Sequence, residues 1–503
     1  MTEYRQSIGS RSSAERLSRR RFLTVSSVAL AGLGAAVLAA CGQAPSTPTP
    51  AAAKPVAPAG AAPTAAAAQP TAAAAAQPTA AAAQPTTAAA PAAAAKSDLK
   101  KADLKTWIWW NDPVQSVKDM GANLNKKQPN LTQSVEAPAD YWTKLQTALA
   151  GGAGPDIYLM NNVNYWSWAY KGVLLELDAR LNGSDEAKDF MAHAWKPGVE
   201  FYRYKGKYLG VPFMMTSIVM FYNEDALGKA GLKPPAEIEE TWTWDTYRDY
   251  ALKLTKREGD KTTFWGAITT QGMELSWLNF IRSNGADYLN ADNTKCVVDQ
   301  DASVEAFDFL TNMALKDNVS PSPEVLQAES LSSVFATGKL GLWINASNAS
   351  KTLNTQVKDF KYNYALLPLA PKTKKRAGNT NVVGWVLNKD GKAIDEAFVG
   401  LANMLTKDSG DILARADVLR PAREDSAELY YDTKVAGGPA NRVAARKMFE
   451  WTTPLPTHEK VSWGEMTKPS NDWANQIFIG KVGAKEGLTK AAAEINDLFA
   501  KAK

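Results

Sequence analysis

Tryptophan beside amide side chains is the first feature of this 503-residue chain that indicates chemistry. The chain has 16 tryptophans, and several stand next to asparagine where an apolar run ends. A flat aromatic ring stacks on the C–H face of a sugar, and amides supply the hydrogen bonds that its hydroxyls need. Because α/β sheets bind ligands at their strand ends, this pattern predicts a carbohydrate cleft. The groupings are Trp110 with Asn111, Trp166 after Asn161-Asn162, Trp343 before Asn345, and Trp385 after Asn381.

Familiar catalytic and metal-binding motifs are absent from the sequence. It contains no Gly-x-Ser-x-Gly, His-Glu-x-x-His or Cys-x-x-Cys. With His193 and His458 as its two histidines, the chain has little material for a histidine-rich metal site or a Ser-His-Asp triad. A pair of carboxylates roughly 5–10 Å apart would still suffice for a glycosidase. We predict a protein that is not an enzyme and needs no metal or cofactor, with a carbohydrate-active enzyme as the alternative.

The N-terminal segment has the pattern of an export signal. Arg19 and Arg20 stand in a basic stretch, and an apolar run over 28–40 ends in Leu-Ala-Ala before Cys41. The run is short for a bilayer span, and small residues before a cysteine are typical of a lipobox. The sequence predicts a Tat-type lipoprotein signal over 1–40 and lipidation of Cys41. A general secretory signal and an ordinary cysteine are the alternatives.

Residues 41–97 are nearly all Ala, Pro, Thr and Gln, which lack large apolar groups to bury. This segment is predicted to be a disordered tether between the lipid and a folded domain. The signal carries six Arg and two Glu, so removing it from 57 basic and 52 acidic residues leaves 51 and 50. The mature net charge is then near +1, which gives no reason to expect a nucleic-acid partner. The remaining cysteine, Cys296, lies in a strand-like run and is predicted to be a buried apolar residue.

Residues 98–503 are long enough for two cores, and their periodicity alternates between strand and helix. Strands are predicted near 105–110, 156–160, 340–344, 362–367 and 382–387. Helices are predicted at 139–149, 165–170, 244–254, from 301, 393–406, 439–450, 468–478 and 485–501, with Thr243 as an N-cap. The stretch 206–235 contains a Gly-Val-Pro break between two strand patterns. It is predicted to cross between two lobes at 213–217, with Met214, Met215 and Thr216 acting as hinge and cleft wall.

Several segments in order resemble a known family. They are Ala148 to Ile157, Gly172 to Leu177, 206–235, Phe335-x-x-Gly338-Lys339, Gly384-Trp385, and Leu419 to Arg423 with Arg420 inserted in the usual turn. Over about 100–503 the chain resembles the extracellular solute-binding proteins of bacterial ABC importers, in the sugar-binding, maltose-binding-protein-like group (family 1).

This resemblance implies an α/β, two-lobed periplasmic-binding-protein fold (type II-like) with three interlobe crossings. Lobe 1 is expected at about 100–214 and 345–412, and lobe 2 at about 215–344 and 413–503. The ligand is expected between them. The predicted ligand-binding residues are Trp110, Asn111, Asp112, Asn161, Asn162, Met214, Thr216, Trp277, Trp343, Asn345 and Trp385.

The resemblance also implies a function and partners. The chain is expected to be a monomer on the extracytoplasmic face of the cell membrane that binds a sugar or oligosaccharide and serves an ABC permease. Two methionines at the predicted hinge favour a larger glycan over a monosaccharide. A binding protein for a non-sugar solute is the remaining alternative.

Overall fold

A computed structural model describes residues 99–270, 272–322, 326, 331–432, 434 and 438–502. The predicted signal, with Arg19 and Arg20, the predicted lipidation site, Cys41, and the whole tether lie outside these residues. Within the described part of the chain, no helix combines the length and apolar character needed to cross a membrane.

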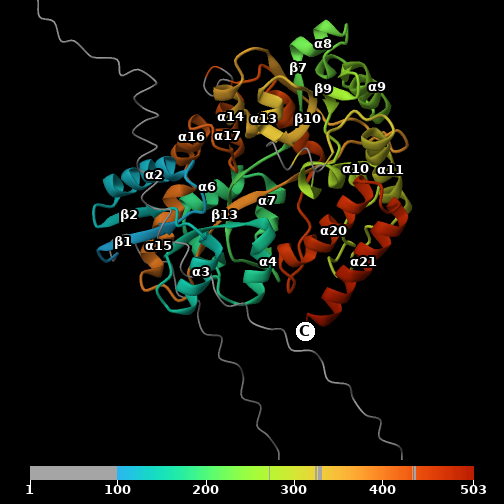
Figure 1. The fold of residues 1–503 in the computed structure, drawn as a ribbon. Helices are drawn as coiled ribbons and strands as arrows, with labels where there is room; N and C mark the ends of the chain where they lie inside the picture. The colour runs from blue at the N-terminus through green and yellow to red at the C-terminus, as the bar shows by residue number, and fades with distance from the viewer. Residues whose placement is uncertain are drawn as a thin grey trace, which may run out of the picture. The chain divides into compact units, whose positions relative to one another are not determined.

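Lobe 1 is built on a six-stranded sheet with the strand order β14-β6-β13-β3-β1-β2 (Figure 1). Strands β1, β2 and β3 are parallel, whereas β13 runs antiparallel to β3 and β6. The strands are β1 Ala102–Trp107, β2 Leu131–Glu136, β3 Ile157–Asn161, β6 Val211–Met215, β13 Val382–Leu387 and β14 Arg420–Pro421, with the hairpin β4 Arg203–Tyr204 and β5 Lys207–Tyr208 outside the sheet. Its helices are α2 Val114–Lys127, α3 Tyr141–Ala150, α4 Asn162–Tyr170, α5 Asp178–Gly183, α6 Asp185–His193, α7 Lys196–Phe201, α15 Ile394–Met404 and α16 Lys407–Arg415.

Lobe 2 is built on a five-stranded sheet with the order β11-β7-β10-β9-β8, and β7 pairs antiparallel with both β10 and β11. The strands are β7 Ile218–Asn223, β8 Lys256–Glu258, β9 Lys261–Ala267, β10 Leu340–Ala346 and β11 Tyr362–Ala365, with a separate pair of β12 Gly378–Thr380 and β15 Thr452–Pro454. The helices are α8 Glu224–Lys229, η1 Pro235–Glu237, α9 Trp244–Leu254, η2 Met273–Leu275, α10 Trp277–Ser283, α11 Asp301–Leu315, α13 Leu331–Ala336, α14 Ala349–Gln356, α17 Glu424–Tyr431, α19 Val443–Lys447, η3 Met448–Trp451, α20 Trp463–Phe478 and α21 Ala484–Lys501.

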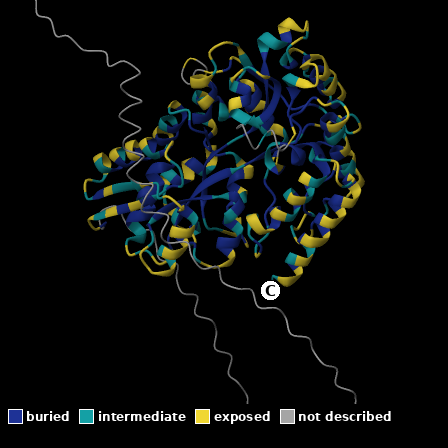
Figure 2. Ribbon diagram, viewed as in Figure 1, coloured by how far each residue is buried: buried dark blue, intermediate teal, exposed yellow. Residues whose placement is uncertain are grey.

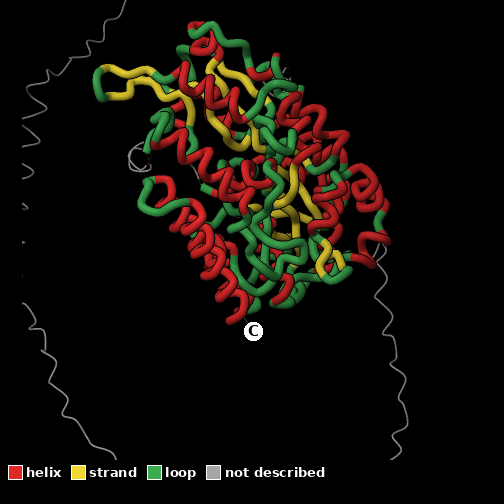
Figure 3. The backbone as a smooth tube through the Cα atoms, turned by 90° about the vertical axis from the view of Figure 1, so that its right-hand side faces the viewer, coloured by secondary structure: helices red, strands yellow, loops and turns green. Residues whose placement is uncertain are grey.

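Each lobe buries its own hydrophobic core around its sheet, and helices cover much of the outside, whereas strand β8 of lobe 2 is exposed (Figures 2 and 3). Helix ends follow local sequence signals. The Thr243 side chain accepts a hydrogen bond from the Thr246 backbone N–H and caps α9, as predicted. Ser462 and Glu465 form a reciprocal capping box at the start of α20. The predicted two-lobed α/β fold is therefore confirmed.

The chain passes between the lobes three times, as predicted, but two boundaries were wrong. The first crossing is at 216–217, between β6 and β7, and the second is at Asn381, just before β13. The third follows β14, because α17 packs in the core of lobe 2. The predicted return at 345 fails because β11 also pairs with β7, which keeps the chain in lobe 2. The predicted departure at 413 fails because β14 pairs with β6 of lobe 1.

Candidate ligand-binding site

The first two crossings lie side by side and bring the ends of several strands together. The Thr380 hydroxyl donates to the backbone carbonyl of Thr216 at 2.6 Å. The Asn162 amide donates to the carbonyl of Thr380 at 3.4 Å, and the Ser347 N–H donates to the carbonyl of Ser217 at 2.8 Å. Asn162 begins α4 directly after β3, and Ser347 directly follows β10. The carboxyl ends of β3, β6 and β10 therefore meet at one place, which we call the junction; sheets of this class bind ligands at such ends.

Four buried polar atoms at the junction have no hydrogen-bond partner among the described residues. They are the side-chain oxygens of Asn162, Asn348, Asn381 and Ser217. They come from lobe 1, lobe 2 and both crossings. A buried polar group left unpaired costs about 1–3 kcal/mol, so such groups are rare without a reason. Their oxygens can accept hydrogen bonds from hydroxyl groups of a ligand held between the lobes.

A group of half-buried tryptophans stands on lobe 1 beside the junction. The ring centroids of Trp109 and Trp110 are 4.7 Å apart, and those of Trp109 and Trp142 are 5.5 Å apart. We call Trp109, Trp110 and Trp142 the tryptophan shelf. Two residues after Trp110, the Asp112 carboxylate lies 3.9 Å from the Lys351 ammonium of α14 in lobe 2. This interlobe ion pair places the loop that carries the shelf next to the other lobe.

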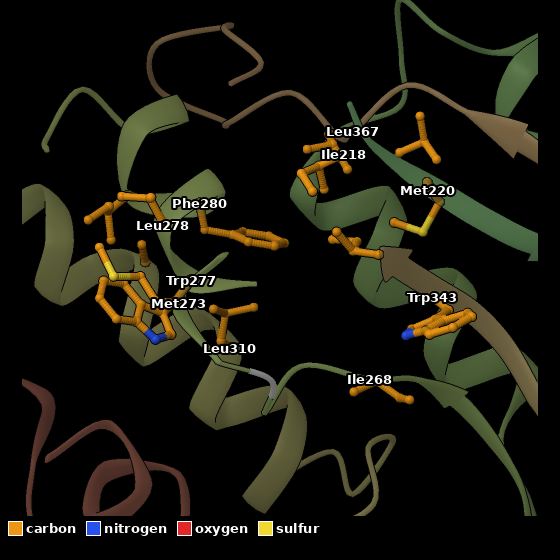
Figure 4. Packing of buried hydrophobic residues seen from close by; sticks show 14 of the residues in the cluster. Ile218, Met220, Ile268, Met273, Trp277, Leu278, Phe280, Leu310, Trp343 and Leu367 are labelled. Carbon is orange, nitrogen blue, oxygen red and sulfur yellow. The ribbon is translucent and has the colours of Figure 1, made fainter. Parts of the chain in front are cut away.

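Four of the predicted ligand-binding residues lie in hydrophobic cores, and that prediction was wrong for them. Trp343 is 1% exposed and contacts Phe221 in lobe 2, where it lies among other buried side chains together with Trp277 (Figure 4). Trp385 is fully buried against Phe213 in lobe 1.

Met214 is fully buried within β6, as is the neighbouring Met215, so neither forms the predicted hinge or cleft wall. Every residue of β6 and β13 is buried, so both faces of these strands are covered and neither is turned to a ligand.

The other predicted residues lie at or beside the junction. Asn111 and Asp112 are exposed, and Trp110, Asn161, Thr216 and Asn345 are half-buried. Two of the amides already have local partners: Asn161 caps α4 by accepting from the Asn164 N–H at 3.2 Å, and Asn345 accepts from the Ala346 N–H at 2.8 Å. Of the asparagines predicted to bind the ligand, Asn162 is the one whose side-chain oxygen is buried without a hydrogen-bond partner among the described residues.

Sequence reasoning missed Trp109, Trp142, Asn348 and Asn381 as binding candidates. Trp109 and Trp142 carried a usable signal, since both are tryptophans at the ends or starts of elements in lobe 1. Asn348 carried none, because it stands in a polar stretch with no aromatic neighbour in sequence. The sequence indicates Asn381 only as a neighbour of Trp385.

Glu274 is another residue that the sequence did not single out. It lies in η2, where its backbone carbonyl accepts from the side-chain amides of Asn279 at 3.1 Å and Asn379 at 2.7 Å. Asn379 directly precedes Thr380, whose hydroxyl bonds to Thr216 at the junction, so η2 lies near the junction. Burial raises the pKa of the Glu274 carboxyl above its ordinary value.

The described part of the chain gives little evidence of a metal site or a reactive thiol. No group of three or more His, Cys, Asp or Glu side chains there is arranged to hold a metal ion. Cys296 is buried, as predicted, and burial raises the pKa of its thiol to about 12. At neutral pH that thiol stays protonated and unreactive.

Comparisons with known proteins agree with this architecture. A family model described as bacterial extracellular solute-binding protein matches residues 112–411. A putative binding protein of Brucella abortus (strain 2308) is 24% identical over 369 residues, which cover 71% of this chain and 82% of the relative. The sn-glycerol-3-phosphate-binding periplasmic protein UgpB of Escherichia coli O1:K1 is 25% identical over 316 residues, which cover 58% of this chain and 68% of the relative.

Among solved structures, an ABC substrate-binding protein of Listeria monocytogenes in complex with cycloalternan superposes with a TM-score of 0.68 at 22% identity. The match covers 79% of this chain and 99% of that structure. The family model matches more than half of this chain, which therefore belongs to the bacterial extracellular solute-binding protein family.

Proposed function

We propose that this solute-binding protein captures a sugar or oligosaccharide between its two lobes and delivers it to the permease of an ABC importer. The observation that carries the proposal is the convergence at the junction of partnerless amide oxygens from both lobes, beside the tryptophan shelf. Amide acceptors with an exposed aromatic face suit a ligand that has many hydroxyls and an apolar C–H face.

Charge at the junction favours a neutral ligand over a phosphorylated one. A phosphate is held best by arginines or by several unpaired N–H donors. Lys351 of α14 faces Asp112 at 3.9 Å, and Arg420, which stands opposite Met215 at the end of β6, pairs with Glu424 at 2.5 Å. The saccharide bound in the Listeria structure supports the same ligand class, whereas the name of the Escherichia coli relative points to a phosphorylated solute.

Membrane anchoring is part of the proposal. The twin arginines Arg19 and Arg20 and the Leu-Ala-Ala-Cys41 sequence support export followed by lipidation, which would keep the protein on the extracytoplasmic face of the membrane. Replacing Cys41 with Ser removes the acylated thiol. We expect Cys41→Ser to release the protein from the membrane fraction, and continued membrane association would contradict a lipid anchor at this residue.

A ligand screen tests the binding function. The full chain is heated with gluco-, xylo-, arabino-, galacto- and manno-saccharides, from monosaccharide to tetrasaccharide, and with sn-glycerol 3-phosphate, while product formation is followed by chromatography. We expect one saccharide series to raise the melting temperature without being cleaved. Cleavage would identify an enzyme, and stabilisation by the phosphate ester alone would identify a different solute.

Two tryptophan variants locate the saccharide. Trp110→Ala should weaken binding by about 1–3 kcal/mol through the loss of a stacking surface. Trp473→Ala is the matched control, because Trp473 is also half-buried but donates to Glu494 on α21 at 2.9 Å, away from the junction. Equal effects of the two variants in calorimetric titrations would contradict a site on the tryptophan shelf.

A further inference from the structure

A cavity of about 900 Å³ lies between the lobes, one helical turn from the junction. On the lobe 1 side it is lined by Trp166 of α4. Trp166 follows Asn162 by four residues, which is about 6 Å along a helix. On the lobe 2 side it is lined by the loops 291–295 and 457–460 and by the end of α21. We call this cavity the Trp166 pocket.

Contacts between the lobes border this pocket. The Tyr204 ring meets the Trp166 ring edge-on at 5.5 Å, and the Tyr204 hydroxyl donates to the Glu459 carboxylate of lobe 2 at 2.9 Å. The Lys205 ammonium lies 3.5 Å from the same carboxylate. Lys205 and Gly206 both have positive φ, as a tight two-residue hairpin turn requires. The pocket is thus a feature of the two lobes together.

Its two walls differ in chemistry. The lobe 1 wall is the Trp166 ring, whereas the lobe 2 wall carries carboxylates, ammonium groups, amides and hydroxyls. Among the lining residues the carboxylates of Asp292 and Glu459 are opposed by the ammonium groups of Lys295 and Lys460. A pocket of this kind gives no advantage to an anion or a cation. It fits a neutral, hydroxyl-rich group with one apolar face.

The histidine in the pocket adds no charge at neutral pH. Burial lowers the pKa of His458, and its ring stacks on Phe499 at 4.0 Å. Its Nδ1 accepts from the backbone N–H groups of Lys460 and Val461 at 3.2 and 3.0 Å, which leaves Nε2 as the protonated nitrogen. His458 therefore holds the loop 457–460 in shape as a neutral ring.

We propose that the Trp166 pocket is an outer subsite, which holds one sugar unit of an oligosaccharide whose inner end lies at the junction. This inference rests on the proposed function and adds to it the size of the ligand: the protein favours an oligosaccharide over a monosaccharide. Asn162 and Trp166 lie on successive turns of α4, so a chain that binds the first can extend to the second.

Calorimetric titration of the full chain tests the subsite, with the saccharide series selected by the ligand screen and each of its members from monosaccharide to tetrasaccharide. In the unmodified protein, affinity should rise about tenfold with the unit that reaches Trp166. Trp166→Ala should abolish this gain and leave the affinity of the shortest bound saccharide unchanged within about twofold. Trp473→Ala should keep the gain.

A second variant leaves Trp166 and its ring contacts intact. Ala500 is an exposed residue of α21 that lines the pocket, so Ala500→Trp fills the cavity without removing any contact. Ala500→Trp should abolish the same gain in affinity with saccharide length. The inference is overturned if both variants keep the gain, or if affinity in the unmodified protein does not rise with length. Either result leaves the proposed function standing, whereas failure of every saccharide to bind overturns both.

Discussion

The backbone carbonyl of Glu274 accepts from Asn379 near the junction, and no opposing charge contributes to the altered pKa of the Glu274 carboxyl. Burial alone raises that pKa above the ordinary value of 4.5. An ionised carboxylate that is partly removed from water without a cation costs folding free energy. The protein therefore keeps a destabilising charge in η2.

Replacing Glu274 by Gln should raise the free energy of unfolding at pH 7. Because the folded-state pKa is raised, the penalty is fully present above it, shrinks as pH falls through it, and is absent below the unfolded-state pKa. The stability advantage of Glu274→Gln should therefore be largest near neutrality and vanish below about pH 4. Urea unfolding at the two pH values measures it. A variant less stable than the unmodified protein at pH 7 would show that the carboxylate has a stabilising partner.

At the scale of residues, sequence reasoning singled out the loop Trp110 to Asp112 and the amide of Asn162, which lie at or beside the junction and stay predictions, but it misplaced Trp343 and Trp385. The cause is physical. β13 is buried on both faces, and β10 is buried over its first five residues. Such strands have no alternation of polar and apolar residues to show which side chains face a cleft. An asparagine next to such a tryptophan shows where the strand ends, but not where the ring points.

Gly384 shows how one element fits against another in lobe 1. A Cβ at this position would lie 2.4 Å from the Tyr202 ring and 2.4 Å from the Val211 carbonyl. Tyr202 is fully buried there and donates through its hydroxyl to the Met160 carbonyl at 2.6 Å. The β13–β6 register also shifts between Val383 and Gly384. The strand that leads out of the second crossing therefore needs glycine at this point.

Gly384→Ala should lower the free energy of unfolding by about 3 kcal/mol, because the added methyl group meets backbone that cannot move aside cheaply. Gly464→Ala is the matched control. Gly464 lies in α20, where a Cβ would meet nothing within 4 Å. The free energy of unfolding of Gly464→Ala should therefore rise by about 0.5 kcal/mol. Urea unfolding curves of the two variants measure both changes in the free energy of unfolding. Equal stabilities would contradict the close approach at β13.

At the scale of elements, most of the helices and strands that the sequence predicted lie within a few residues of their observed bounds, but others, among them α2, β2, β9 and α16, were not predicted. Periodicity and caps are local signals, as Thr243 at α9 shows. The lobe boundaries were not predictable in the same way. β10 and β11 both pair with β7, and this pairing joins strands far apart in the chain. Hydrophobic patterning within a strand does not say which partner it will have.

Opposite charges link the two lobes in the whole molecule. Glu459 of lobe 2 accepts from Tyr204 and lies near Lys205 of lobe 1, and Lys351 of lobe 2 lies near Asp112 of lobe 1. The Lys205 and Glu459 side chains are 66% and 32% exposed, so their ion pair is screened by solvent and weak. Together these contacts favour the arrangement in which the lobes face each other across the junction.

Glu459→Gln should reduce affinity for the shortest saccharide that binds by about two- to fivefold, since an exposed ion pair contributes little. The difference from the unmodified protein should disappear in high salt, because salt screens the pair. Glu428→Gln is the control, because Glu428 pairs at 2.7 Å with Arg446, which belongs to the same lobe. A loss of affinity that persists in high salt would contradict an electrostatic link between the lobes.

For the whole molecule, the order and spacing of family segments predicted two lobes, three crossings and a ligand between them. The family and the fold are confirmed. The lipid anchor stays a prediction, because Cys41 lies outside the residues that the structure describes.

A crystal structure of the protein grown with the tightest saccharide from the ligand screen tests the central claim most directly. The account predicts a saccharide enclosed by both lobes and stacked on Trp110. Its hydroxyls should lie within hydrogen-bond distance of the side-chain oxygens of Asn162, Asn348 and Asn381. A saccharide on the outer surface of one lobe, without contact to these three amides, would contradict the account.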